Sequence, residues 1–153
     1  MKIAVLNDTH AGVRNSSDIF LNYQKKFYEE QFFPYLKEHG ITQILHLGDY
    51  YDHRKFINFK AQNENRKMFL EPMRDLGITM DIIPGNHDEY YRDKRDYNSV
   101  AFIKKFENIQ FYNDITTVDG VAFNVGDVLG AKVDNASTTT YAANWFPLEV
   151  NHD

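Results

Sequence analysis

The chain has 153 residues, of which 42% are hydrophobic and 15% aromatic, which indicates one domain with a substantial apolar core rather than a disordered chain. It has no cysteine, so disulfides, thiolate metal sites and cysteine nucleophiles are excluded. The net charge of −5 argues against a module that holds DNA by charge alone, but it is compatible with an enzyme that approaches phosphate through bound cations. The sequence has neither an apolar run of about 18 residues nor a signal-peptide pattern, so we expect no membrane span and a cytoplasmic protein.

Short aliphatic runs alternate with segments of helical spacing along the first 112 residues. Strands are expected over residues 2–6, 41–47, 78–83 and 109–112. Helices are expected over residues 18–39, 59–76 and 98–106. This order predicts an α/β fold with a mainly parallel sheet flanked by helices. Residues 116–118 and 121–123 then flank Asp119-Gly120, a strong hairpin signal.

The two longer helices have recognisable signals. Residues 15–18 are typical of a helix cap, Pro34 predicts a kink, and Gly40 is expected to end the first helix. The apolar positions expected on that helix are Phe20, Tyr23, Phe27 and Leu36. Those expected on the second helix are Met68, Phe69, Met73 and Leu76, with Pro72 near its end.

Polar clusters follow each of the first three expected strands. They are Asp8-x-His10, Gly48-Asp49 and the run Gly85-Asn86-His87-Asp88. Because ligands bind beyond the carboxyl ends of parallel strands, we expect these clusters to form one site. On an extended segment, Asp8 and His10 would point to the same side and could meet one cation.

The residue types in these clusters suit a two-metal phosphoesterase. Asp49 can bridge two ions, Asn86 offers a neutral oxygen to the second, and His87 can reach a phosphate. Two cations about 4 Å apart could clamp a phosphodiester and activate a water. His87 would protonate the leaving alkoxide or stabilise the developing charge.

These motifs, in this order, resemble the opening of the calcineurin-like metallophosphoesterases. Residues 1–10 and 48–53 are similar to the SbcD-type nuclease branch, and residues 54–59 and 69–72 resemble the tailed-phage recombination endonuclease subunit. The resemblance covers residues 1 to about 118. It implies the amino-terminal half of a metallophosphoesterase sandwich, with an incomplete nuclease domain over residues 1–124 and a divergent tail over residues 125–153.

The resemblance also implies roles for individual residues. Asp8 and His10 would ligate the first metal, Asp49 would bridge, and Asn86 would ligate the second. His87 would be the catalytic histidine. The resemblance implies two divalent cations. Manganese is the expected metal, and magnesium is the alternative. The partners implied are DNA, an SbcC-type, SMC-like ATPase subunit and a second copy of the chain joined by the early helices.

Several nearby residues have two interpretations. His53 either steers the phosphodiester, as the resemblance implies, or is an exposed loop histidine. The basic side chains that could contact DNA phosphates, or be ordinary surface charge, are Arg14, Arg54, Lys55 and Lys60. The tyrosines that could stack on unpaired bases, or simply pack, are Tyr50, Tyr51, Tyr90 and Tyr91. Asp52 and Asp88 are expected to accept hydrogen bonds rather than bind metal, and His39 and His46 are expected to be structural.

The sequence departs from the family after His87. A complete member continues with another histidine and a later Gly-His-x-His cluster, whereas the only later histidine here is His152. We therefore expect a shortened gene product or a fragment of a longer chain, with His152 a less favoured replacement ligand. Three functions stay open: a metal-dependent DNA nuclease in phage recombination, repair and replication; a broader phosphatase or phosphodiesterase; and an interaction module without catalysis.

Overall fold

The computed structural model describes residues 2–53, 55–85, 87–91, 94–103, 106–112, 116–118, 121–123 and 132–133. Within this part of the chain, a four-stranded parallel sheet has the order β1-β2-β3-β6. Its strands are β1 (Ala4–Leu6), β2 (Gln43–His46), β3 (Thr79–Ile82) and β6 (Ile109–Phe111). All four match the runs expected from the sequence.

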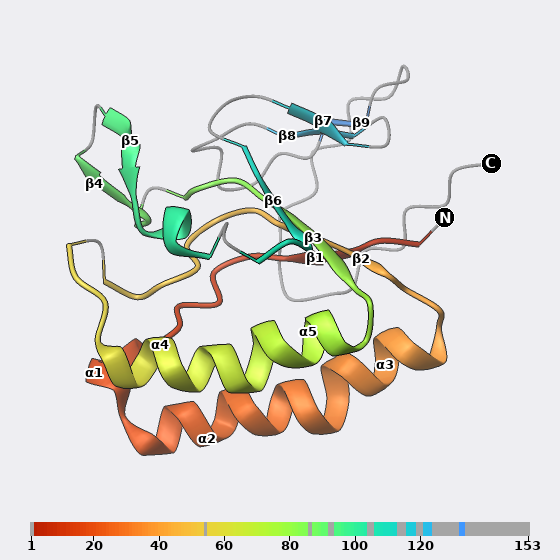
Figure 1. The fold of residues 1–153 in the computed structure, drawn as a ribbon, viewed down its shortest axis with the longest axis horizontal. Helices are drawn as coiled ribbons and strands as arrows, with labels where there is room; N and C mark the ends of the chain where they lie inside the picture. Colours follow the sequence, from red (N-terminus) through yellow and green to blue (C-terminus); the bar gives the residue numbers. More distant parts are fainter. Residues whose placement is uncertain are drawn as a thin grey trace.

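Two long helical segments connect the first three strands. The first comprises α1 (Val13–Ser16), α2 (Asp18–Lys26), η1 (Phe27–Phe32) and α3 (Phe33–Glu38). The second comprises α4 (Phe59–Asn65), η2 (Arg66–Leu70) and α5 (Glu71–Asp75). Both lie on the same face of the sheet (Figure 1), as expected for right-handed crossovers between strands that are neighbours in order.

Both segments contain a π-helical stretch directly before the turn that carries a proline. The stretch η1 precedes Pro34 and η2 precedes Pro72. Proline has no backbone N–H and its ring collides with the carbonyl four residues back, so a wider turn accommodates it without ending the helix. The kink expected at Pro34 thus takes the form of a local change in helical pitch.

Glycines end both segments in the same way. Gly40 has φ 64°, its N–H bonds to the carbonyl of Lys37, and Ile41 N–H bonds to that of Leu36. This pair of bonds is the Schellman arrangement, and it confirms Gly40 as the residue after the helix cap. Ser17 occupies the N-cap of α2, as the sequence suggested, but its side chain makes no capping hydrogen bond.

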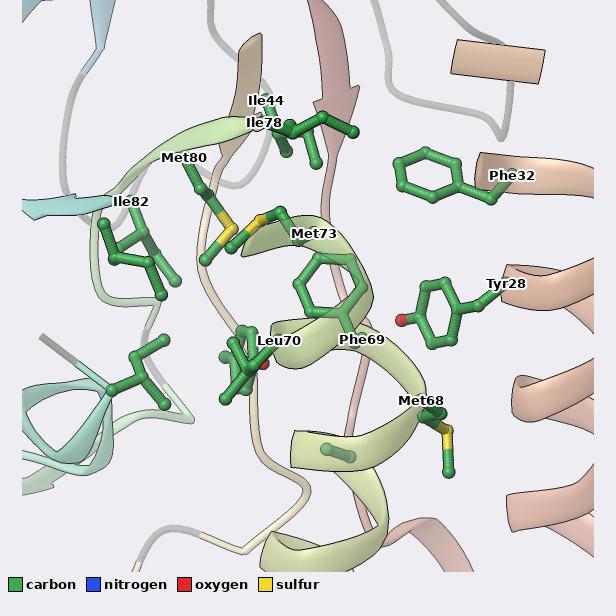
Figure 2. Packing of buried hydrophobic residues seen from close by; sticks show 14 of the residues in the cluster. Tyr28, Phe32, Ile44, Met68, Phe69, Leu70, Met73, Ile78, Met80 and Ile82 are labelled. Atoms are coloured by element: carbon green, nitrogen blue, oxygen red, sulfur yellow. The ribbon is translucent and has the colours of Figure 1, made fainter. Parts of the chain in front are cut away.

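The core lies between the helices and the sheet, around the fully buried ring of Phe69. Tyr28 and Phe32 of the first helical segment point toward it from the neighbouring helix (Figure 2). The ring centroid of Phe69 is 4.9 Å from that of Tyr28 and 6.4 Å from that of Phe32. Figure 2 also shows Met73 and the strand residue Met80 completing the layer against the sheet.

The expected apolar face of the first helix is wrong at three positions. Tyr23 is 68% exposed, Phe20 40% and Phe27 39%, whereas Leu36 is buried as expected. The side chains that face the core in place of these three are Leu21, Tyr28, Phe32 and Phe33, and they pack there together with Leu36. On the second helix Met68, Phe69 and Met73 are buried as expected, but Leu76 is exposed.

Beyond β3 the chain differs from the expected helix over residues 98–106. An antiparallel hairpin of β4 (Glu89–Tyr91) and β5 (Lys94–Asn98) comes first, followed by the short 3₁₀ turn η3 (Ser99–Phe102). The expected hairpin is confirmed, because β7 (Thr116–Val118) pairs antiparallel with β8 (Val121–Phe123), and β9 (Lys132–Val133) adds a third strand. No helix in the described part of the chain is long and apolar enough to cross a membrane.

Candidate metal centre

Three loops meet at one edge of the sheet because β1, β2 and β3 are adjacent and in register. Leu6 at the end of β1 pairs with His46 at the end of β2, which pairs with Ile82 at the end of β3. In Figure 1 these strands end toward the β4–β5 hairpin. The polar clusters that follow the three strands are therefore brought together, as the sequence indicated.

The first two loops run side by side beyond the strands. Asp8 N–H donates to the carbonyl of Gly48 at 3.2 Å, and His10 N–H donates to that of Asp49 at 3.1 Å. The backbones of Asp8, His10 and Asp49 are left-handed, with φ of 52°, 42° and 53°. The extended geometry expected for Asp8-x-His10 is therefore wrong. Non-glycine residues adopt this conformation at a cost, and such residues concentrate at functional sites.

The side chains of these three residues converge. Asp8, His10 and Asp49 each offer a ligand atom, and these atoms all lie within 4.8 Å of one another. His10 Nε2 is 3.6 Å from Asp8 Oδ1. Asp49 is buried, whereas Asp8 and His10 are partly exposed, so the cluster is packed against the protein on its inner side and open to solvent on the other.

The charges of the cluster favour a bound cation. Burial raises the pKa of Asp8 above its ordinary value, and the adjacent carboxylate of Asp49 raises it further. Two carboxylates held together in this way repel each other, and a divalent ion placed between them removes that repulsion. Two carboxylate oxygens and an imidazole nitrogen form a ligand set suited to manganese, magnesium, iron or zinc.

The third loop approaches so closely that glycine is required at two positions. A Cβ atom on Gly85 would collide with the carboxylate and backbone of Asp49, and one on Gly48 would collide with the backbone of Gly85. This approach lets His87 N–H donate to Asp49 Oδ1 at 2.9 Å. The exposed ring of His87 lies edge-on to His10, with the ring centroids 5.7 Å apart.

This geometry can be compared with known proteins. The family model described as calcineurin-like phosphoesterase matches residues 1–150. The chain belongs to the calcineurin-like phosphoesterase family. The match extends past residue 118, where the resemblance noted in the sequence ends.

Two known proteins are similar to this phosphoesterase chain. "Exonuclease subunit 1" of Enterobacteria phage T4 is 35% identical over 120 residues, which cover 78% of this chain and 35% of that protein. The chain thus spans about a third of the length of that relative. Among solved structures, the nuclease MPE of Pseudomonas putida matches 76% of this chain and 50% of its own, with a TM-score of 0.47 and 18% identity.

Asp88 holds the second and third loops of the phosphoesterase chain together. Its buried carboxylate accepts hydrogen bonds from Gly85 N–H at 2.8 Å, Tyr50 N–H at 3.0 Å and the hydroxyl of Ser99 at 3.2 Å. Burial raises the pKa of Asp88 to about 6, while the N–H bond from Gly85 opposes that rise. Asp88 is thus a hydrogen-bond acceptor, as the sequence suggested.

His46 has a larger part in the site than the sequence suggested. Gly48 N–H donates to its Nδ1 at 3.1 Å, so the ring proton is on Nε2, which lies 2.9 Å from Thr9 Oγ1. The Thr9 hydroxyl then donates to the carbonyl of Tyr50 at 3.2 Å. The signal for this role in the sequence was His46 itself. It is a polar residue within the otherwise aliphatic run 44–47, which precedes Gly48.

The other residues singled out from the sequence are distributed around the centre. Asp52 lies between two histidines, 3.5 Å from His10 Nδ1 and 3.9 Å from His53 Nε2. Arg14 and Lys55 are exposed.

Lys60, Tyr50 and Tyr51 all contact other parts of the chain. Lys60 is paired with Asp18 at 2.6 Å. Tyr50 and Tyr51 are buried and pack in the core, so neither can stack on a base. Asn86, Arg54 and His152 lie outside the described residues.

Proposed function

We propose that this chain provides the metal-binding part of a nuclease that hydrolyses DNA phosphodiester bonds with two divalent ions. The observation that carries the proposal is the convergence of Asp8, His10 and Asp49, whose ligand atoms lie within 4.8 Å of one another on strained loops. DNA as the substrate is supported by the relative from phage T4, which is named an exonuclease subunit.

The proposed ligands would serve two ions. Asp8 and His10 would hold the first, Asn86 would hold the second, and the buried carboxylate of Asp49 would serve both. Manganese is the proposed ion, with magnesium as the alternative, because oxygen and imidazole donors suit both better than soft thiophilic metals. When bound, the ions lower the pKa of a water and stabilise charge on the phosphate.

The two nearby histidines act on the phosphodiester. The backbone N–H of His87 bonds to Asp49 and its exposed ring lies beside His10, which supports a role for this ring in donating a proton to the leaving oxygen. His53 lies 3.9 Å from Asp52 beside the centre, and its imidazole is proposed to donate a hydrogen bond to a phosphate oxygen.

Basic side chains around the centre contact the DNA backbone. Arg14 and Lys55 are exposed cations and, with Arg54, are the proposed phosphate contacts. Lys60 contributes less, because its ammonium is already paired with Asp18 at 2.6 Å.

The chain acts within a larger assembly. The T4 relative is named a subunit, which supports an SbcC-type ATPase partner in phage DNA recombination, repair and replication in the host cytoplasm. A dimer joined by the early helices is supported by α2, which exposes Ile19 (66%), Tyr23 (68%) and Phe20 (40%).

Metal titration tests the centre directly. Calorimetric titration with manganese should show uptake by the wild-type chain and none by the double variant Asp49→Ala, Asn86→Ala. The control is Asp75→Ala, which removes an exposed acid that pairs with Arg74 instead. Circular dichroism should show all three proteins folded. Unchanged uptake by a folded double variant would rule out the two-metal centre.

Substrate choice tests the nuclease assignment. With manganese, the wild-type chain should cut a single-stranded oligonucleotide, and Asp49→Asn should abolish the cut. Hydrolysis of a phosphopeptide or nucleotide without any cut in DNA would assign the chain to a broader phosphatase instead.

A further inference from the structure

Aromatic rings are exposed beside the metal centre, on the loop that follows Asp52. The ring of Phe56 is 63% exposed and stacks on the ring of His53, with centroids 4.5 Å apart and planes 21° from parallel. Phe59, at the start of α4, is 86% exposed. Large apolar rings in water carry a cost that packing in this chain does not offset, and such positions commonly mark binding surfaces.

Two close side-chain contacts join this stacked pair to the metal centre. His10 Nδ1 is 3.5 Å from Asp52 Oδ1, and Asp52 Oδ2 is 3.9 Å from His53 Nε2. The ring of Phe56 is therefore two side chains away from His10. A phosphodiester held at the centre would place its neighbouring nucleotides over these rings.

The same loop carries a positive charge. Lys55 Nζ lies 5.7 Å from the ring centroid of Tyr90, which is 41% exposed on β4. We call His53, Lys55, Phe56 and Tyr90 the aromatic ledge. Flat rings next to a cation are the combination that binds single-stranded nucleic acid, since the rings stack on bases and the cation attracts phosphate.

We propose that the aromatic ledge stacks on unpaired bases next to the bond to be cut, and so selects single-stranded or frayed DNA. This inference rests on the proposed nuclease function. In a duplex, each base face is covered by its neighbours, so rings at the surface gain stacking only where bases are unpaired. A protein partner seated on the ledge would cover the adjacent centre as well, which makes nucleotides the better occupant.

The test compares two single strands of equal length and charge, one ordinary and one in which the bases are replaced by abasic sites. Binding of each labelled strand is measured by fluorescence anisotropy with calcium as the divalent ion. Stacking contributes about 1–3 kcal/mol per base, so the wild-type chain should bind the ordinary strand about tenfold more tightly or better. The abasic strand measures the phosphate contribution alone.

Variants of one exposed ring assign the preference to the ledge. Phe56→Ala should remove most of the preference for bases, whereas Phe56→Trp should keep it. Leu76→Ala, which removes an exposed apolar side chain just after α5, should leave the ratio of the two affinities unchanged. Because Phe56 is exposed, the substitutions should not alter folding, and circular dichroism checks this.

Two outcomes overturn the proposal: equal affinity of the wild type for both strands, or a preference that survives Phe56→Ala. In the second case, a change of oligomeric state in Phe56→Ala would assign the surface to a protein partner. Cleavage with manganese separates this proposal from the nuclease assignment. Cleavage without a preference for bases would contradict only the proposal for the aromatic ledge. A preference for bases without cleavage would contradict only the nuclease assignment.

Discussion

His46 Nε2 lies 2.9 Å from Thr9 Oγ1, and this hydrogen bond joins the end of β2 to the loop after β1, 37 residues away in the sequence. Because the other ring nitrogen of His46 accepts from Gly48 N–H, one buried imidazole holds the backbone on both sides of the candidate metal centre. The spacing between Asp8 and Asp49 therefore depends on two residues that bind no metal themselves.

Replacing Thr9 with valine tests this link. Valine has nearly the same shape but no hydroxyl, so the buried Nε2–H of His46 loses its acceptor. Thr9→Val should lower the free energy of unfolding by about 1–3 kcal/mol and weaken manganese binding. Urea unfolding and calorimetric titration measure the two effects. Thr9→Ser keeps the hydroxyl and should retain metal affinity close to wild type. Equal metal affinity in Thr9→Val would show that the bond has no positioning role.

Stability should depend on pH through His46. Burial, with a smaller effect of His10, lowers the pKa of His46 to about 3, whereas an unfolded histidine has a pKa of about 6.5. Below about pH 6.5 the unfolded chain binds a proton that the folded chain does not, so stability falls as the pH drops. The expected slope is up to about 1.4 kcal/mol per pH unit.

The variant His46→Gln isolates this contribution. Glutamine can still accept from Gly48 and donate to Thr9, but it does not titrate. Urea unfolding at pH 7, 6 and 5 should give a flatter dependence for the variant than for the wild type. Parallel curves would mean that His46 has the same pKa in the folded and the unfolded chain.

Gly85 tests whether the close approach of the loops is needed for metal binding. A methyl group there would collide with Asp49, so Gly85→Ala should separate the second and third loops and reduce manganese affinity at least tenfold in calorimetric titration. Gly40→Ala is the matched control, because its methyl group meets nothing within 4 Å. It should cost about 1 kcal/mol of stability through its φ of 64° and leave metal binding intact. The same metal affinity in both variants would contradict the steric argument.

Asp88 should be needed for stability although it binds no metal. In Asp88→Asn an NH₂ group, which is a hydrogen-bond donor, replaces one carboxylate oxygen. The variant side chain therefore cannot accept the hydrogen bonds from both Gly85 N–H and Tyr50 N–H. The expected loss is about 1–3 kcal/mol of unfolding free energy at pH 8, where the wild-type carboxylate is ionised. Ser99→Ala removes a single bond to Asp88 and should cost less. If Asp88→Asn were the more stable protein in thermal unfolding, relief of charge burial would outweigh the lost bonds.

The sequence predicted most of the sheet and the location of the site. Aliphatic runs that end at Leu6, Leu47 and Ile83 are strongly local signals, and parallel strands necessarily bring their carboxyl ends to one edge. The glycine that ends the first helix and the hairpin around Asp119-Gly120 were predicted for the same reason, since each depends on the conformations open to a few adjacent residues.

The inward face of the first helix could not be read in the same way. Phe20, Tyr23 and Phe27 recur at helical spacing, and so do Leu21, Tyr28 and Phe32. Helical periodicity shows that an apolar stripe exists, but the choice between two stripes depends on the partner, which here is Phe69 from another helix. The short 3₁₀ turn after Asn98 has a similar origin. Asn98 pairs with Glu89 across a hairpin, and Ser99 N–H bonds to the carbonyl of Asp88.

The sequence by itself determined which chemical groups the centre contains, because Asp8, His10 and Asp49 are fixed by position after their strands. Only the tertiary structure decided how these groups meet. Their left-handed backbones are held by hydrogen bonds between loops, and the spacing is set by His46 and by the contact of Gly48 with Gly85. Those contacts join residues dozens of positions apart, so no local propensity encodes them. They arise when the parallel strands come into register and the helices bury the core.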